Sequence, residues 1–155
     1  RQPPSGGAPR RGGLEVDVAA HAELAQNRFV GIQRMSRQEE PDRVELRDAE
    51  PGETVLLLNH VYLDADCPYR GSHAIYIREG AEQAYGAVDQ IPAAIRRRLI
   101  SLRAFDASNM MVAAEVVQGT ELEPLIERFL ALPEVVFLQA HHARRGCFAA
   151  RIERA

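Results

Sequence analysis

The feature that most constrains the fold is a pair of alternating segments near the end of the chain, residues 135–142 and 147–153. Apolar residues recur there at every second position, which is typical of strands buried on one face. The connection Ala143-Arg144-Arg145-Gly146 suits a type I turn that a left-handed glycine closes. A β-hairpin with a three-residue loop and a bulge is therefore predicted.

The hydrophobic pattern selects the register of this hairpin, because a slip of one residue would move every side chain to the other face. The selected register pairs Ala143 with Cys147. The nearly apolar face then carries Val136, Leu138, Ala140, His142, Phe148, Ala150 and Ile152. The mixed face carries Val135, Phe137, Gln139, His141, Cys147, Ala149, Arg151 and Glu153. We therefore expect His142 in the core and His141 beside Cys147.

The preceding segments extend this hairpin into an α+β domain. Further strands are predicted at residues 29–35, 43–47, 54–63, 72–78, 99–106 and 110–118, and helices at 17–25, 91–98 and 120–132. We expect a mainly antiparallel sheet with two principal helices, 91–98 and 120–132, packed on one face. The second of these helices is the one followed by the C-terminal hairpin.

Turn chemistry supports two more connections. Glu50-Pro51-Gly52-Glu53 has the residues of a type II turn, and Asn109 suits a left-handed position between two strands. In the middle hairpin, formed by residues 99–106 and 110–118, the apolar face is predicted to carry Ile100, Leu102, Ala104, Val112, Ala114 and Val116. Ser101, Arg103 and Glu115 are predicted on the opposite face.

Composition sets the class of the protein. With 155 residues, of which 46% are hydrophobic, the chain has the size of one domain. We expect residues 1–13 to form a disordered tail and 14–155 a single domain. The formal charge of -3 argues against a nucleic-acid partner, and no apolar run is long enough for a membrane span. Composition leaves the oligomeric state open.

Basic residues and cysteines indicate the cellular setting. Every basic residue other than histidine is arginine, which is typical of a bacterium with a GC-rich genome and excludes chemistry that needs a lysine. Cys67 and Cys147 lie far apart in the sequence, and a domain of this size does not require a disulfide. We therefore expect reduced thiols and a cytoplasmic protein.

The loop around Tyr69 and Arg70 is the first candidate binding site, because polar loops carry function more often than cores do. Arg70 could anchor a carboxylate or a phosphate. Arg103 could join it from the middle hairpin, and Gln139 and Arg151 from the last one. In the alternative reading, the loop is a structural connection in which Tyr69 is packed and Arg70 pairs with a nearby aspartate.

Cys147 and His141 are the candidate catalytic residues, as a nucleophile and its base. The alternative is a small buried cysteine and a surface histidine. The histidines and cysteines lack the close spacing of a zinc site, so no metal and no cofactor are expected.

Several blocks of the sequence also resemble a known family. These blocks are Leu46–Leu58, Pro68–Arg70, Ser72–Ile75, Leu102–Asp106, Met110-Met111 and His141–Arg151. Together they are similar to a bacterial family named only as a domain of unknown function (number 1203). The resemblance implies a chain of about this length and no particular activity. Where that family's pattern has Pro-Cys-Arg before a strand, this chain has Pro41-Asp42-Arg43.

Two classes of function remain open from the sequence. The first is a small binding module for an anionic small molecule or a protein partner. The second is a small enzyme that uses Cys147 with His141. The binding module is favoured because no complete set of catalytic residues can be assembled.

Overall fold

The structure is a computed structural model that describes residues 12–13, 33–35, 41–81, 85 and 89–154. The expected helix at 17–25 and most of the expected tail at 1–13 lie outside these residues, but Gly12–Gly13 form a strand. Over the described residues, the strands are β1 (Gly12–Gly13), β2 (Gln33–Met35), β3 (Val55–Leu63), β4 (Gly71–Arg78), β5 (Leu99–Phe105), β6 (Met111–Gln118), β7 (Phe137–His142) and β8 (Phe148–Arg154). The helices are α2 (Ala93–Arg96) and α3 (Leu122–Leu130), with a 3-10 turn at Gly119–Glu121.

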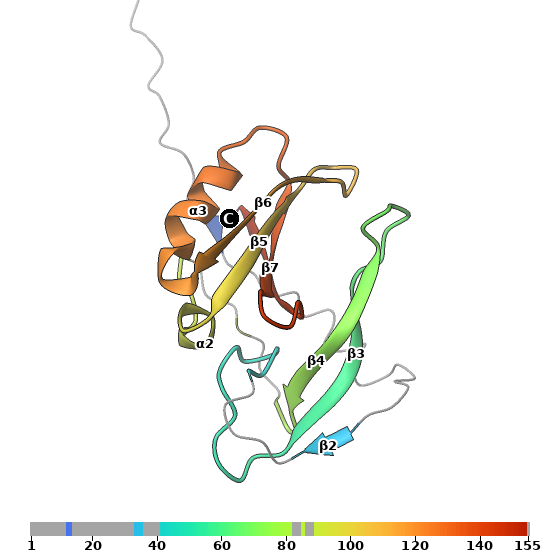
Figure 1. Ribbon diagram of the computed structural model, residues 1–155, viewed down its shortest axis with the longest axis vertical. Coiled ribbons are helices and arrows are strands. Elements are labelled where there is room, and N and C mark those ends of the chain that lie inside the picture. Colours follow the sequence, from blue (N-terminus) through green and yellow to red (C-terminus); the bar gives the residue numbers. More distant parts are fainter. Residues whose placement is uncertain (1–11, 14–32, 36–40, 82–84, 86–88, 155) are drawn as a thin grey trace, which may run out of the picture.

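The strands form two antiparallel sheets rather than the single sheet that was expected. The large sheet has the order β1-β8-β7-β5-β6, and the small sheet has the order β2-β3-β4. Figure 1 shows α2 and α3 on one side of the large sheet and β3 and β4 on the other. The large sheet is therefore the middle layer, with a helix-facing side and a side that faces the small sheet.

The expectation of two principal helices is wrong, although the α+β class with mainly antiparallel strands is confirmed. Of the described helices, α3 has nine residues and α2 has four. Helix α2 is short because the chain enters β5 at Leu99, and Leu99 already pairs with Gln118 of β6. Gly119 lies against α2, where an added Cβ would come within 2.1 Å of the carbonyl oxygen of Ile95.

The helix-facing side of the large sheet holds the main hydrophobic core. Five apolar residues of α3 recur at helical spacing and are buried: Leu122, Leu125, Ile126, Phe129 and Leu130. They pack on a set of sheet residues that are almost fully shielded from solvent: Ile100, Leu102, Ala104, Leu138, Ala140, Ala150 and Ile152. Burial of this kind is the main stabilising term of a small domain.

Residues 43–47 do not form the predicted strand. The side chain of Asp42 is fully buried, and its carboxylate accepts hydrogen bonds from the backbone N–H groups of Glu45 and Arg78, at 2.7 and 2.9 Å. Such a local side-chain bond competes with strand pairing and bends the chain into turns. Leu46 then takes a positive φ of 50°, which a strand would not contain.

Three predicted turns are confirmed by the backbone. Gly52, Asn109 and Gly146 all have positive φ angles, of 91°, 59° and 76°. Glu53 donates its N–H to the carbonyl oxygen of Glu50, as a β-turn at this position requires.

The predicted registers of the β5–β6 and β7–β8 hairpins are each wrong on one side of a register shift in the strand pairing. Between β5 and β6 the register shifts at Ala104 and Phe105, so Arg103 faces Ala114. Between β7 and β8 it shifts after Ala140, so His141 pairs with Phe148. A bulge inserts an extra residue and moves the side chains beyond it to the other face. Val116 and Ala114 therefore share the side of Arg103, and Phe148 shares the side of His141.

Candidate functional site

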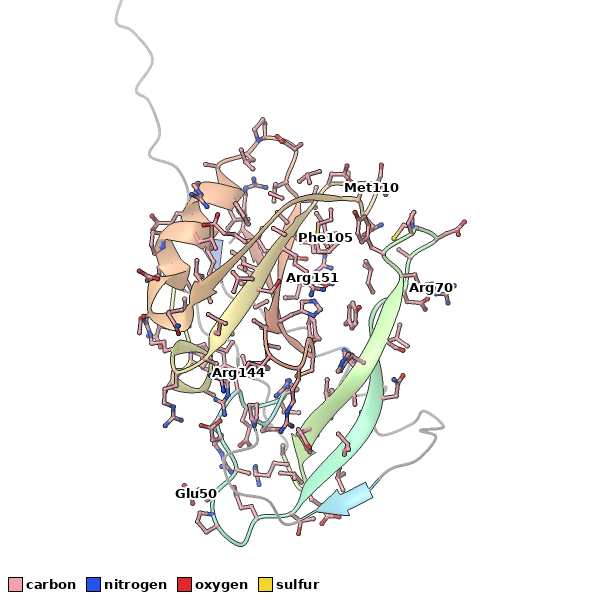
Figure 2. The ribbon with its side chains drawn as sticks, viewed as in Figure 1. Glu50, Arg70, Phe105, Met110, Arg144 and Arg151 are labelled. Atoms are coloured by element: carbon pink, nitrogen blue, oxygen red, sulfur yellow. The ribbon has the colours of Figure 1, made fainter. Side chains whose placement is uncertain are left out.

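Buried polar groups gather on the side of the large sheet that faces the small sheet, which we call the polar side. Its residues are Ser101, Arg103, Phe105, Phe137, Gln139, His141, Phe148 and Arg151. Arg103, Gln139 and Arg151 are cross-strand neighbours in one row of β5, β7 and β8. Figure 2 shows Phe105 and Arg151 on this side of the sheet, toward β3 and β4.

A chain of hydrogen-bonding groups links the polar side to the small sheet. His141 Nδ1 lies 3.0 Å from the carbonyl oxygen of Gly146, and His141 Nε2 lies 3.0 Å from Gln139 Oε1. Gln139 Nε2 donates to the carbonyl oxygen of Tyr62 at 3.2 Å. Both side chains have a relative exposure of 0%. The two sheets are therefore joined by directional bonds as well as by apolar contact.

The electrostatic surroundings of His141 disfavour its protonated form. Burial lowers the pKa of His141 to about 4, and the hydrogen bond with Gly146 offsets this only in part. Electrostatic interactions with Arg103, His73 and Arg43 lower the pKa further. The ring is therefore neutral at physiological pH in the structure as it stands.

Aromatic side chains surround this histidine. The ring of Tyr62 meets the His141 ring edge-on at a centroid distance of 5.0 Å and stacks on Phe148 at 5.9 Å. The ring of His60 lies 5.6 Å from that of Phe148. Gly71 makes room for Tyr62, because a Cβ at Gly71 would lie 2.4 Å from the tyrosine hydroxyl. Neither Tyr62 nor His60 is among the site residues predicted from the sequence, although their alternation with Leu58 on β3 marks a common face.

The two arginines of the polar side differ in their partners. Arg151 bonds Glu153 at 2.5 Å, and its guanidinium carbon lies 3.7 Å from the centroid of the Phe137 ring. Arg103 is half-buried and donates from Nε to Ser101 Oγ at 3.3 Å. Among the described residues no carboxylate pairs with Arg103, so its terminal nitrogens keep free hydrogen-bonding capacity.

In the Tyr69 and Arg70 loop, Arg70 pairs with a nearby aspartate, as the alternative to a binding role predicted. Arg70 pairs with Asp64 at 2.7 Å and keeps 64% of its side chain exposed. Figure 2 shows it pointing outward, away from the large sheet. Tyr69 instead contacts the polar side, with its ring edge-on to Phe105 at 6.0 Å. The structure therefore brings Tyr69 toward the other candidates and leaves Arg70 apart from them.

Cys147 is not the neighbour of His141 that the predicted register required. Its carbonyl oxygen accepts the N–H of His142 at 2.9 Å, whereas His141 pairs with Phe148. The buried thiol of Cys147 accepts a hydrogen bond from Arg43 Nη2 at 3.0 Å. Arg43 is itself buried and also donates to the carbonyl oxygen of Phe148 at 2.6 Å. No local pattern revealed this contact, which spans more than 100 positions of the sequence.

His142 is buried toward the helix-facing side of the sheet. Burial lowers its pKa to about 3, and the charges of Arg43 and Arg98 act in the same direction. Its Nδ1 atom has no hydrogen-bond partner among the described residues. A neutral imidazole is the form that such surroundings favour.

Neither a metal-binding group nor a membrane-spanning helix is found in the part of the chain that the structure describes. No three side chains of His, Cys, Asp or Glu come together there in a way that could hold a metal ion. None of the helices there is long and apolar enough to cross a bilayer. Cys67 and Cys147 are both free thiols.

Comparison with known proteins identifies the family of the chain. The model of the family described as "Protein of unknown function (DUF1203)" matches residues 39–154. No curated protein and no solved structure matches the chain.

Proposed function

The chain belongs to the DUF1203 family, whose description names no activity, and from the chain's own residues we propose that it is a small module that binds an anionic small molecule. The proposed site lies on the polar side of the large sheet around Arg103. Gln139, Arg151 and Tyr69 border it. Arg70 is not part of this proposal, because Asp64 already neutralises it.

The observation that carries the proposal is the unpaired guanidinium of Arg103. A guanidinium stays charged at any physiological pH, and removing it from water without an anionic partner costs free energy. The exposed Arg70 and the half-buried Arg151 both have a carboxylate partner. Arg103 bonds only a neutral hydroxyl among the described residues. An anion bound there would supply the missing charge.

The neighbours of Arg103 fit recognition of a small anion. Terminal guanidinium nitrogens bind carboxylate, sulfate or phosphate oxygens in a bidentate manner. Ser101 is half-buried beside Arg103 and offers a hydroxyl. Ala114 lies across from Arg103 on the edge strand β6 and is exposed, which leaves a direction of approach. A half-buried charge favours a small ligand over a flat protein surface, so the small molecule is preferred to a protein partner.

The enzyme alternative, Cys147 with His141, has less support. Both ring nitrogens of His141 lie within hydrogen-bond distance of groups other than Cys147, namely Gly146 and Gln139. The Cys147 sulfur is held by Arg43 instead of by a base. A nucleophile and its base need to lie within hydrogen-bond reach of each other.

We place the module in the bacterial cytoplasm. The support is the exclusive use of arginine and the two free thiols, which suit a reducing compartment.

A thermal-shift screen against inorganic and organic anions tests the proposal. At least one anion among sulfate, phosphate, citrate and nucleotides should raise the melting temperature of the wild-type protein in a saturable manner. Arg103→Met should abolish that shift. Arg128→Met is the matched control, because it removes the same charge from the exposed face of α3, where Arg128 pairs with Glu115. A shift that survives Arg103→Met, or no shift with any anion, contradicts the proposal.

A further inference from the structure

The chain of groups from Gly146 to Tyr62 ends in a hydrogen-bond acceptor on both sides. The carbonyl oxygens of Gly146 and Tyr62 can only accept, so His141 Nδ1 and Gln139 Nε2 must donate outward. His141 Nε2 and Gln139 Oε1 then face each other at 3.0 Å. In a neutral imidazole, Nε2 is also an acceptor, and no proton lies between these two atoms.

Rotating the Gln139 amide does not remove the conflict. The rotated amide would donate to His141 Nε2, but its oxygen would then face the carbonyl oxygen of Tyr62 at 3.2 Å. An imidazolium satisfies the whole chain, because it donates from both ring nitrogens. The hydrogen-bonding groups around His141 therefore accommodate one proton more than the neutral ring carries, on Nε2 between the ring and Gln139.

Positive charge around the ring opposes that proton. Arg103 on β5, His73 on β4 and Arg43 before β3 all act against protonation, and burial acts in the same direction. Tyr62 and His60 face the ring cluster from β3. Arg151 lies beyond Gln139 on β8, where Glu153 already pairs with it. No carboxylate among the described residues bonds to His141.

We propose that anion binding at Arg103 is coupled to the uptake of a proton by His141. The inference rests on the proposed function and adds its regulation. An anion on the Arg103 guanidinium cancels the charge that most opposes protonation of His141, and it attracts the new imidazolium. The imidazolium then completes the hydrogen bonds from Gly146 to Tyr62 and ties the small sheet to the large one. The ligand class is a small anion that binds more tightly as the pH falls.

The direction of the pH dependence follows from linkage. The pKa of His141 is about 4 without ligand and is raised when the anion is bound. Between these two values the complex holds the proton and the free protein does not, so lowering the pH favours binding. Within this window the affinity rises by up to tenfold for each pH unit. Above the higher value the affinity becomes independent of pH.

Isothermal titration with sulfate tests the coupling, since sulfate keeps the same charge over the pH range concerned. Affinity should rise between pH 8 and about 5. Titrations in buffers of different ionisation enthalpy should show net uptake of up to one proton per anion. His141→Gln should bind sulfate without this pH dependence. His142→Gln, which removes a second buried histidine on the other side of β7, should keep it.

NMR of the histidine rings in the wild-type protein gives a second readout that does not depend on a variant folding. The His141 resonance should titrate at higher pH with saturating sulfate than without it. The rings of His60, His73 and His142 are observed separately and show whether they take up the proton instead. Sulfate binding that needs Arg103 but leaves His141 unshifted overturns the coupling and keeps the anion site. Absence of sulfate binding at every pH overturns the coupling, and the anion site itself falls if phosphate, citrate and nucleotides also fail to bind.

Discussion

The two sides of the large sheet are built from different chemistry, even at positions that are equally well buried. Leu138 on the helix-facing side and Gln139 on the polar side are adjacent in β7, and both have a relative exposure of 0%. Leu138 is held by contacts that have no required direction. Gln139 lies within hydrogen-bond distance of Tyr62 and His141, and such contacts require that donors and acceptors match. The helix-facing side therefore supplies stability, whereas the polar side fixes one arrangement of the two sheets and carries the candidate site.

The largest expected effect is on the helix-facing side. Leu138→Ala should lower the free energy of unfolding by about 4 kcal/mol, because it leaves a cavity among fully buried neighbours. Urea unfolding followed by circular dichroism measures this change. Sulfate affinity of the folded variant should stay close to that of the wild type. A loss below about 1 kcal/mol would show that this side is not the main source of stability.

Acid should weaken the fold through the histidine of the polar side. His141 has a pKa of about 4 in the folded protein and about 6.5 when unfolded, so the unfolded chain binds more protons between these values. Stability is therefore complete above about pH 6.5 and is lost as the pH falls toward 4. The loss due to His141 should be on the order of 3 kcal/mol. Unfolding curves of wild type and His141→Gln across this range measure it, and equal slopes would disprove this contribution.

A smaller effect is expected where the small sheet meets the polar side. Gly71→Ala places a methyl group against the hydroxyl of Tyr62, whose ring must then move away from His141 and Phe148. We expect a loss of about 1–2 kcal/mol and a changed near-ultraviolet circular dichroism spectrum. Ser72→Ala, at the exposed next position, is the matched control. Unchanged spectra in both variants would mean that Tyr62 is not fixed by this packing.

The smallest effect should come from Arg70. Its ion pair with Asp64 is largely exposed, and such pairs contribute little to stability. Arg70→Ala should change the free energy of unfolding by less than about 0.5 kcal/mol and leave anion binding intact. If calorimetry instead showed lost anion binding, the site would belong to the loop and not to the polar side.

The parts of the fold that depend on local chemistry could be predicted from the sequence. The turns at Gly52, Asn109 and Gly146 require positive φ angles that few residue types adopt easily, so their residues identify them. The stripe of α3 follows the helical period. The bulges could not be predicted, because alternation on either side of a bulge looks regular. One missed bulge was enough to assign Phe148 and Cys147 to the wrong sides of the hairpin.

In the candidate site, only the contacts between residues close together in the sequence could be predicted. Gln139 and His141 share a face because they are two residues apart in one strand. Their partner Tyr62 lies 77 positions earlier, and nothing in either segment indicates that the two meet. Arg43 is a similar case, since its contact with Phe148 spans 105 positions. Residues 43–47 also alternate like a strand, and only the fully buried Asp42 explains why they turn instead.

The strand order of the large sheet also has a consequence for how the chain folds. The strands β7 and β8 leave the ribosome after β3, β4, β5, β6 and both helices, yet β7 lies in the interior of the sheet. Until β7 is added, Leu138 and Ala140 are missing from the core that α3 and β5 share, and the carbonyl oxygen of Tyr62 lacks its final partner. Contacts of such long sequence separation slow folding. Most of the domain must therefore wait for its last two strands before it reaches a stable state.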